Sequence, residues 1–390
     1  MPCQVTSPGV GGFDFGTMTL IAVVGMTGPL LTSIPGLRIP VVIGELIGGM
    51  VLGKTGFDVV DTHDPTFTLL ADVGFALVMF VVGTNVPLRD RSLRGSIPRA
   101  ALRASAVGVV AIVLATILAT AFHTGHAGVY AVLMVSSSAA LALPVIQSLK
   151  LDDQNALDVT AQIAIADAVC IVLLPLVINP VRAVPAAIGA GIIAACALAL
   201  FAALRAVDRR GMRRRLHHYS ARHRFALELR ISLIVLFSFA ALAVAGHVSI
   251  MLAGFALGLV VSAVGEPRRL ARQLFGITEG MFAPLFFVWL GASLQIRELF
   301  DRPGFALLGV GLGLGAVLAH WVGGLMGQPL ALASLAAAQL GVPVAAAALG
   351  TEENLMAPAE PSALMLGALL TIAVTSIASV VASRRASPAE

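Results

Sequence analysis

Charged residues are scarce in this chain. They make up 12% of its 390 residues, whereas hydrophobic residues make up 58%. The mean hydropathy of +0.95 lies far outside the range of soluble domains. The composition is therefore that of a polytopic membrane protein and leaves little sequence for a separate soluble domain.

Cysteines and enzyme motifs are also lacking. Cys3, Cys170 and Cys196 are scattered, and two of them lie inside apolar segments, so we expect neither a disulfide framework nor a cysteine metal site. The sequence has no HExxH, no GxSxG and no pair of intramembrane aspartates, so we expect no enzyme activity, no catalytic residue and no cofactor. The N-terminus has no basic region and carries Asp14, so we expect no cleavable signal.

Long apolar runs fill most of the chain. Their lengths are close to the roughly 20 residues that a helix needs to cross a bilayer. They predict an all-α protein with about thirteen transmembrane helices. The predicted helices lie near 17–34, 39–53, 66–86, 99–122, 128–149, 157–178, 184–207, 225–246, 248–264, 276–294, 303–327, 329–350 and 361–383.

Basic residues gather on one side of this topology. Of the 25 lysines and arginines, all but four fall on one face, and such a bias marks the cytoplasmic side. The four on the other face are Lys54, Arg182, Arg297 and Arg302. We therefore expect an extracellular segment 1–16, a cytoplasmic tail 384–390 and a multi-pass protein of the plasma or inner membrane. With only this tail after the last helix, we expect no appended nucleotide-binding domain.

The most basic stretch, 208–224, contains no interleaved aromatic residues that would indicate nucleic-acid binding. We expect it to be a cytoplasmic loop that touches anionic lipid head groups. A pH-sensing role for His217, His218 and His223 is the alternative.

One carboxylate, Asp167, lies in the middle of the apolar segment 158–178, DVTAQIAIADAVCIVLLPLVI. An ionised aspartate at bilayer depth costs roughly 2.5 to 3.5 kcal/mol even on insertion scales. Such a residue faces a partner or a water-filled path, so Asp167 is the first candidate for a functional site.

Two apolar segments carry helix-breaking and polar residues at membrane depth. These residues are Ser136, Ser137, Ser138 and Pro144 in the first segment, and Gln339, Gly341 and Pro343 in the second. Paired interruptions of this kind in the two halves of a chain indicate a transporter binding site, because freed backbone groups must face protein or water. For either segment alone, a proline kink with serines bonded to their own helix explains the pattern equally well.

Five motifs in order carry a resemblance to a known family. They are IPVVIGELIGGMVLGKTG (39–56), LADVGFALVMFVVGTNV (70–86), VSSSAALALPVI (135–146), the Asp167 segment and APLFFVWLGASL (283–294). Together they resemble the membrane domain of the monovalent cation:proton antiporters, in particular the second, largely prokaryotic group of Na⁺ or K⁺ exchangers. The resemblance covers about 17–383.

The resemblance implies an inverted-repeat antiporter fold in which two discontinuous helices cross beside the ion site. It also implies moving core helices at about 99–178 and 303–383, dimerisation or scaffold helices at about 17–86 and 225–294, and a linker helix at about 184–207. Alternating access would be of the elevator type, in a homodimer that serves pH homeostasis. Independently of the family, Gly44, Gly48, Gly49 and Gly53 form a small-residue face that predicts close helix packing.

The expected ion chemistry is competition of an alkali cation and a proton for Asp167. Hydroxyls of Ser136, Ser137 and Ser138, with freed carbonyls, would complete an oxygen shell suited to a hard cation. Ala166 stands where family members commonly carry a second polar residue, which favours electroneutral exchange or an impaired transporter. Two different functions would fit the same fold, namely Na⁺-coupled symport of an organic anion and the role of a degenerate protein that transports nothing.

Three further side chains are possible accessories. His320 lies where many relatives carry a lysine, and it is either an imidazolium near Asp167 or a neutral ring bonded to a backbone carbonyl. Glu45 either supplies the carboxylate that position 166 lacks or is solvated or cavity-lining. Gln339 is a candidate only because it lies next to the helix-breaking residues Gly341 and Pro343. Asp72 is expected to be solvated near the outer interface.

Overall fold

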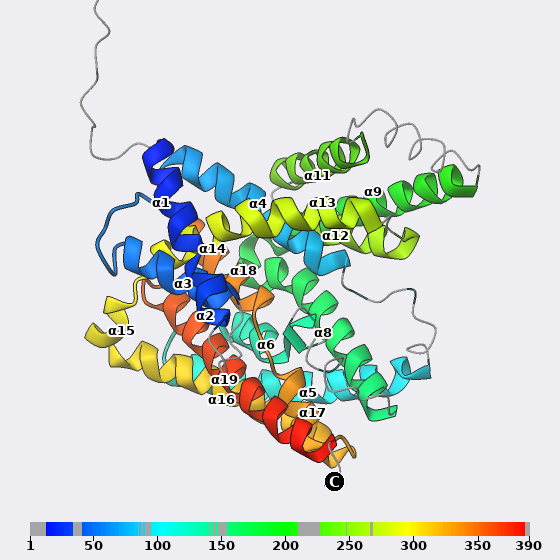
Figure 1. Ribbon diagram of the computed structural model, residues 1–390. Coiled ribbons are helices and arrows are strands. Elements are labelled where there is room, and N and C mark those ends of the chain that lie inside the picture. Colours follow the sequence, from blue (N-terminus) through cyan, green and yellow to red (C-terminus); the bar gives the residue numbers. More distant parts are fainter. Residues whose placement is uncertain are drawn as a thin grey trace, which may run out of the picture.

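The computed structural model describes residues 13–33, 41–84, 86, 89, 95–139, 141–142, 146, 154–209, 227–246, 248–265 and 268–386. These residues form helices and no strands (Figure 1). Nine segments are long and apolar enough to cross a membrane, and the apolar helices Val41–Leu52, Leu229–Ala245 and Ile250–Val264 are shorter. The predicted all-α membrane class is confirmed, and the count of thirteen helices stays a prediction.

The helices form two packed groups joined by a long helix. The first group contains α1 (Phe15–Gly25), α2 (Thr27–Thr32), α3 (Val41–Leu52), α4 (Pro65–Thr84), α11 (Leu227–Ala245), α12 (Ile250–Val264), α13 (Arg268–Ile277), the π-helical turn η3 (Thr278–Phe282) and α14 (Ala283–Ser293). The second contains α5 (Ile97–Ala121), α6 (Ala127–Val135), α8 (Gln154–Ile178), α16 (Pro303–Leu325), α17 (Leu330–Ala336), α18 (Gly341–Glu352) and α19 (Glu360–Ala386). Between them lie the short η2 (Pro180–Arg182) and α9 (Ala183–Arg209), and α15 (Arg297–Asp301) precedes α16.

Aspartates cap two of the first helices. Asp14 Oδ1 accepts the N–H of Thr17 at 2.8 Å at the start of α1. Asp64 Oδ1 accepts the N–H groups of Thr66 and Phe67 before α4. These backbone donors lower the pKa of both carboxyls, because they stabilise the ionised form.

Glycines set the close approach of helices within the first group. A Cβ on Gly49 would lie 2.3 Å from Val288 O, and one on Gly291 would lie 2.2 Å from Leu46 O. The backbones of α3 and α14 therefore touch where a side chain could not fit. The close-packing face predicted for the segment 39–53 is confirmed.

The second group packs in the same way, with α16 against α19. A Cβ on Gly309 would lie 2.7 Å from Ala363 O. The joining helix α9 touches α8 as well as α11 and α12, and the two groups also meet where α12 contacts α8 and α14 contacts α18. The predicted division into moving core helices, scaffold helices and a linker helix stays a prediction.

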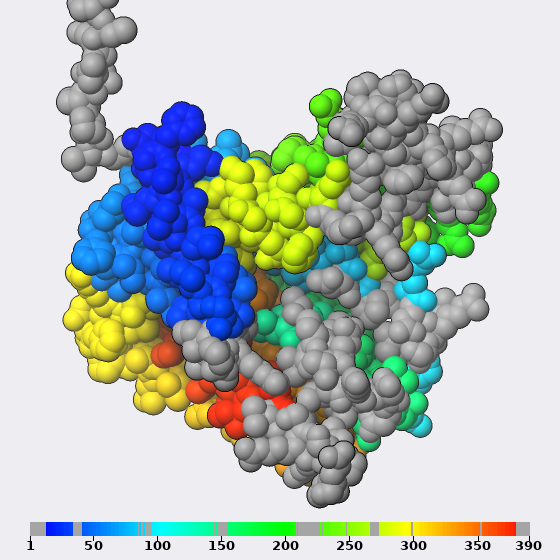
Figure 2. Space-filling view, viewed as in Figure 1, coloured from blue at the N-terminus to red at the C-terminus, as the bar shows by residue number. Residues whose placement is uncertain are grey.

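Apolar side chains cover much of the outside of the bundle. Ile112 and Ile117 on α5 and Ile188 and Leu198 on α9 are all more than 45% exposed. Figure 2 shows α1, in dark blue, lying along the outside of the molecule. Such an apolar exterior fits hydrocarbon rather than water, as expected for a chain whose described part contains nine apolar segments of membrane-spanning length.

Candidate functional site

Two helices are interrupted near the middle of the bundle, where Figure 1 places α6 and α18. α6 ends at Val135, and Ser136 has extended backbone angles. In the other half, α17 ends at Ala336 and α18 begins at Gly341. The N–H of Ser138 donates to Ala338 O at 2.7 Å, so the two unwound segments are bonded to each other.

The predicted helix breakers lie at or near these interruptions. Gly341 is the first residue of α18, and Pro343 lies in its first turn, where a missing N–H breaks no helical bond. Pro144 lies outside the described residues.

Asp167 faces the first interruption. It lies on α8 and is 2% exposed, and its Oδ2 accepts the N–H of Ala139 at 3.2 Å. Among the described residues, no lysine, arginine or histidine nitrogen forms an ion pair with it. The carboxylate therefore has a main-chain donor rather than a fixed positive partner among the described residues.

Ser137 links the first interruption to the second half. Its hydroxyl donates to Ala336 O at 2.6 Å, and its Oγ lies 3.3 Å from His320 Nε2. His320 Nδ1 lies 2.9 Å from Ala316 O, and because a carbonyl only accepts, Nδ1 carries a proton. The ring is thus bonded to a backbone carbonyl and reaches the candidate site through Ser137.

The charge of His320 follows from two opposing effects. Burial opposes a charge on the ring, which is 1% exposed. A proton on Nε2, however, would let Nε2 donate to Ser137 while Ser137 donates to Ala336 O, so that every group is bonded. The imidazolium and the neutral ring, both predicted from the sequence, therefore stay open.

The other two serines make different contacts. Ser136 donates its hydroxyl to Leu133 O in its own helix at 2.7 Å, which is the local serine bonding that the sequence allows for a kinked helix. Ser138 is 5% exposed, and its main chain joins the two interruptions. Of the three predicted hydroxyls, that of Ser137 bridges the two halves.

Gln339 holds the second interruption in place. Its side-chain amide donates to Leu133 O, and its N–H donates to Thr371 Oγ1 at 3.2 Å. Thr375 Oγ1, one turn further along α19, lies 3.1 Å from Ser334 O. Neither threonine was predicted from the sequence, although two hydroxyls four residues apart on an apolar helix would have indicated a shared face.

Glu45 is buried in the first group. It is 3% exposed, and α3 packs on α1, α2 and α14. A Cβ built on Gly28 would lie 3.0 Å from Glu45 Cγ. Of the alternatives for Glu45, the solvated one is wrong, because this short segment of the sequence still forms a helix packed on three sides. A second carboxylate for the ion site and a cavity-lining residue both stay predictions.

Two buried polar clusters lie outside the crossing, the place where the unwound segments after α6 and before α18 meet. Neither cluster was predicted from the sequence. Arg103, counted with the cytoplasmic cations, is 6% exposed and lies 3.5 Å from Asp158 Oδ2, which joins α5 to α8. Glu360 accepts from Tyr130 and lies 2.7 Å from His126 Nδ1, which joins the start of α6 to the start of α19. The hydrogen bond to Glu360 raises the pKa of His126, which lies just before α6.

Comparison with known proteins identifies the family. The sequence profile described as "Sodium/hydrogen exchanger, transmembrane" matches residues 20–382. The chain belongs to this family. The resemblance drawn from the five sequence motifs is confirmed.

Individual relatives agree with the profile. The chain is 22% identical over 320 residues to YjbQ of Bacillus subtilis, covering 73% of this chain and 48% of YjbQ. It is 26% identical over 334 residues to the Na(+)/H(+) antiporter NhaS5 of Synechocystis, covering 80% of this chain and 46% of NhaS5. The chain thus spans about half the length of these curated relatives.

A solved structure has the same fold. The sodium proton antiporter MjNhaP1 from Methanocaldococcus jannaschii, at pH 8, superposes with a TM-score of 0.63 at 16% identity, covering 94% of this chain and 97% of the other. The predicted antiporter fold is therefore confirmed.

Proposed function

We propose that the chain exchanges Na⁺ or K⁺ for H⁺ across a cell membrane, with Asp167 binding cation and proton in turn. The observation that carries the proposal is the hydrogen bond from Ala139 N–H to Asp167 Oδ2, which places a buried carboxylate against an unwound helix. Membership of the sodium/hydrogen exchanger family supports the reaction class.

Oxygen atoms near Asp167 suit a dehydrated alkali cation. Hard cations take oxygen ligands, and the unwound segment brings hydroxyl and carbonyl oxygens to membrane depth. Ser137 is the best placed of the serines, because its Oγ joins the first interruption to Ala336 O and His320 Nε2 in the second half of the chain. In this proposal the cation displaces the proton of Asp167 and takes Ser137 Oγ as a second ligand.

Competition for one carboxylate couples the two ions. A bare carboxylate is costly to move through an apolar barrier, so the core crosses only when Asp167 carries a proton or a cation. Ala166, which is 3% exposed, offers no second titrating group. One positive charge is then exchanged for another, and the cycle is electroneutral.

His320 acts on this site through Ser137. The ring contacts Ser137 Oγ, and no ion pair joins it to Asp167 among the described residues. We assign it the role of a positioning residue that orients the Ser137 hydroxyl. The expected signature of this role is a changed pH profile of exchange in His320→Gln, together with a weaker apparent affinity for the cation.

The moving part in this proposal is the group of α5, α6, α8 and α16 to α19, in an elevator motion against the first group. The protein would lie in the plasma or inner membrane as a homodimer, with the N-terminus outside, and would contribute to pH homeostasis. Surrounding lipid would contact the exposed apolar side chains of α5 and α9.

The test is ion flux in proteoliposomes with an internal pH dye. Addition of Na⁺ or K⁺ should dissipate an imposed pH gradient in the unaltered chain and in Asp301→Asn, which removes an exposed carboxylate at the end of α15. Asp167→Asn should abolish the response. Full activity in Asp167→Asn, or no response of the unaltered chain to any alkali cation, would overturn the proposal.

A further inference from the structure

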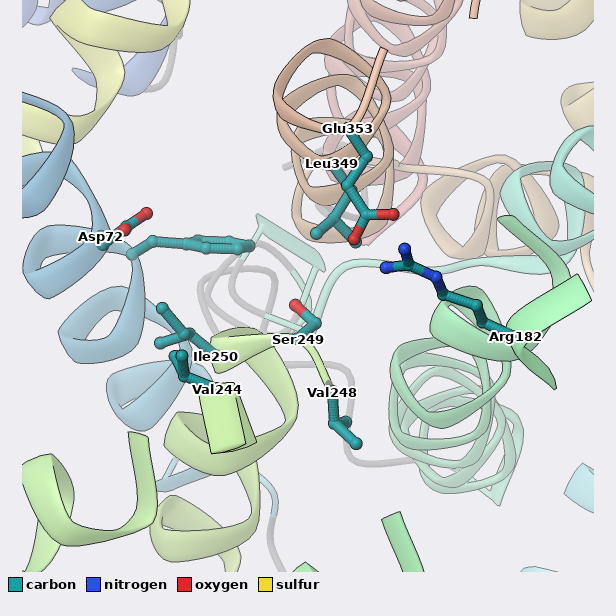
Figure 3. A pocket seen from close by; sticks show the side chains of 9 residues that line it. Asp72, Arg182, Val244, Val248, Ser249, Ile250, Leu349 and Glu353 are labelled. Carbon is teal, nitrogen blue, oxygen red and sulfur yellow. The ribbon is translucent and has the colours of Figure 1, made fainter. Parts of the chain in front are cut away.

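A second polar region lies away from the crossing. A cavity of about 290 Å³ opens between α4, the turn from α11 to α12, η2 and the end of α18 (Figure 3). Its polar side chains are Asp72, Arg182, Ser249 and Glu353, and the rest of its lining is apolar. The cavity therefore lies between the two helix groups. Asp72, which the sequence predicts to be solvated near the outer interface, lines this cavity and is partly exposed.

Arg182 is the one basic side chain among the described residues that line the cavity. Figure 3 shows its guanidinium and the Glu353 carboxylate pointing toward one another, with the Ser249 hydroxyl directed into the space and Asp72 on the opposite side. No ion pair joins Arg182 to either carboxylate among the described residues. Its charge is therefore not cancelled by contact and acts on whatever enters the cavity.

One face of α4 leads from this cavity toward the crossing. Asp72, Phe75 and Met79 are three and four residues apart, so they share a face. A Cβ on Gly341, the first residue after the second interruption, would lie 3.9 Å from Met79 Cε. Seven residues of helix span about 10 Å, so Asp72 lies about two turns from Met79, and Phe75, which also lines the cavity, lies about one turn from it.

The route is closed in this structure. Phe75 is 5% exposed and Met79 is 1% exposed. Phe75 also stacks on Phe286 of α14, with ring centroids 4.7 Å apart. On this face of α4, Phe75 lines the cavity and the buried Met79 lies between it and Gly341. We therefore expect an ion to pass only after the helix groups move apart.

We propose that this cavity is the entrance through which the transported cation approaches the crossing from one side, and that Arg182 determines how readily cations enter it. The inference rests on the function proposed above. With Asp72 and Glu353 ionised, Arg182 lowers the formal negative charge of the lining by half. Charges that line a cleft change the local concentration of an approaching ion and its rate of association, so the loss of Arg182 would favour cations.

A labelling experiment tests the cavity without any transport. Ser249→Cys, in a chain with Cys3, Cys170 and Cys196 changed to serine, places a thiol where the hydroxyl points inward. Its reaction rates with a trimethylammonium and a sulfonate methanethiosulfonate reagent report the local potential. Arg182→Gln should raise the cationic-to-anionic rate ratio roughly tenfold at low ionic strength, and high salt should reduce the change.

The matched control is Arg302→Gln, which removes an exposed cation of the same predicted face outside the cavity lining. It should leave the ratio unchanged. An unreactive thiol at position 249, or the same ratio with and without Arg182, would overturn the proposal.

Transport supplies the second arm. In the chain with its native cysteines, Arg182→Gln should lower the half-saturating cation concentration severalfold from one side of the membrane and not from the other, and Glu353→Gln should raise it on that same side. Unchanged values from both sides would overturn the entrance role. Failure of the proposed exchange function would appear as retained flux in Asp167→Asn. The labelling rates do not depend on flux, so measuring them in Asp167→Asn as well tests the cavity independently of the exchange function.

Discussion

The two interrupted helices are held in different ways. The first, after α6, is bonded through Ala139 N–H to a carboxylate that can gain or lose a charge. The second, before α18, is held by the neutral groups of Gln339, Thr371 and Leu133. In the proposed mechanism, a change of proton or cation at Asp167 acts directly on the first interruption. It reaches the second through the bonds from Ser138 N–H to Ala338 O and from Ser137 Oγ to Ala336 O. In this mechanism the first half of the chain responds to the ion and the second half provides the frame.

The largest expected effect is a loss of stability at the second interruption. Gln339→Leu removes the amide donor that ties the second interruption to Leu133 O, which keeps its bonds from Ser136. The loss of one buried hydrogen bond costs about 0.5 to 1.5 kcal/mol. The thermal unfolding midpoint in detergent should fall clearly. Gln328→Leu is the control, because both polar atoms of the Gln328 side chain are buried without a hydrogen-bond partner, so its loss should cost less or stabilise. Equal losses in the two variants would contradict the role given to Gln339.

Two neighbouring serines test the role of the first interruption in ion exchange. Ser137→Ala removes the hydroxyl that joins Ala336 O and His320, and should lower the cation-driven flux roughly tenfold, equivalent to about 1.4 kcal/mol. Ser136→Ala removes a bond within α6 only and should change the flux little. The measurement is the initial rate of each variant in proteoliposomes, relative to the unaltered chain. A larger loss in Ser136→Ala than in Ser137→Ala would contradict the role proposed for Ser137.

A smaller effect is expected at the junction of the two halves beside His126. Its raised pKa means that the bond to Glu360 stabilises the fold below the ordinary histidine pKa and loses this contribution as the pH rises through the folded-state value. The midpoint difference between the unaltered chain and His126→Gln should therefore be largest at low pH and shrink as the pH rises. A difference that grows with pH would have the wrong sign.

The smallest effect is expected at Gly341. No atom lies closer than 3.9 Å to a Cβ built there, and its φ is not in the left-handed region. Gly341→Ala should therefore be neutral or stabilise by about 0.4 to 1 kcal/mol. A measured loss of more than about 1 kcal/mol in unfolding free energy would show that the second interruption needs glycine and is less rigid a frame than proposed.

The sequence was sufficient to predict the fold class and the family. Composition and apolar length identify membrane helices, and five motifs in order lead to the family that the profile confirms. Serines, glycine and prolines at membrane depth also predict both interruptions, because they disrupt helical hydrogen bonding wherever they are packed.

The pairing of side chains between helices could not be predicted. The contact of Ser137 with Ala336 spans 199 positions, and that of His126 with Glu360 spans 234. Such contacts depend on the rotation and depth of each helix, which hydropathy does not specify. Arg103 shows the same limit, since a cation near a helix end is counted with the loop although its guanidinium is buried against Asp158.

The central claim is that proton and cation compete for Asp167, and proton release on cation binding tests it most directly. The purified chain in a weakly buffered detergent solution is titrated with Na⁺ or K⁺, with choline as the control, and the pH is followed. Competition predicts that protons are released in step with cation binding, and that Asp167→Asn releases none. Binding without proton release, or undiminished release in Asp167→Asn, would contradict it.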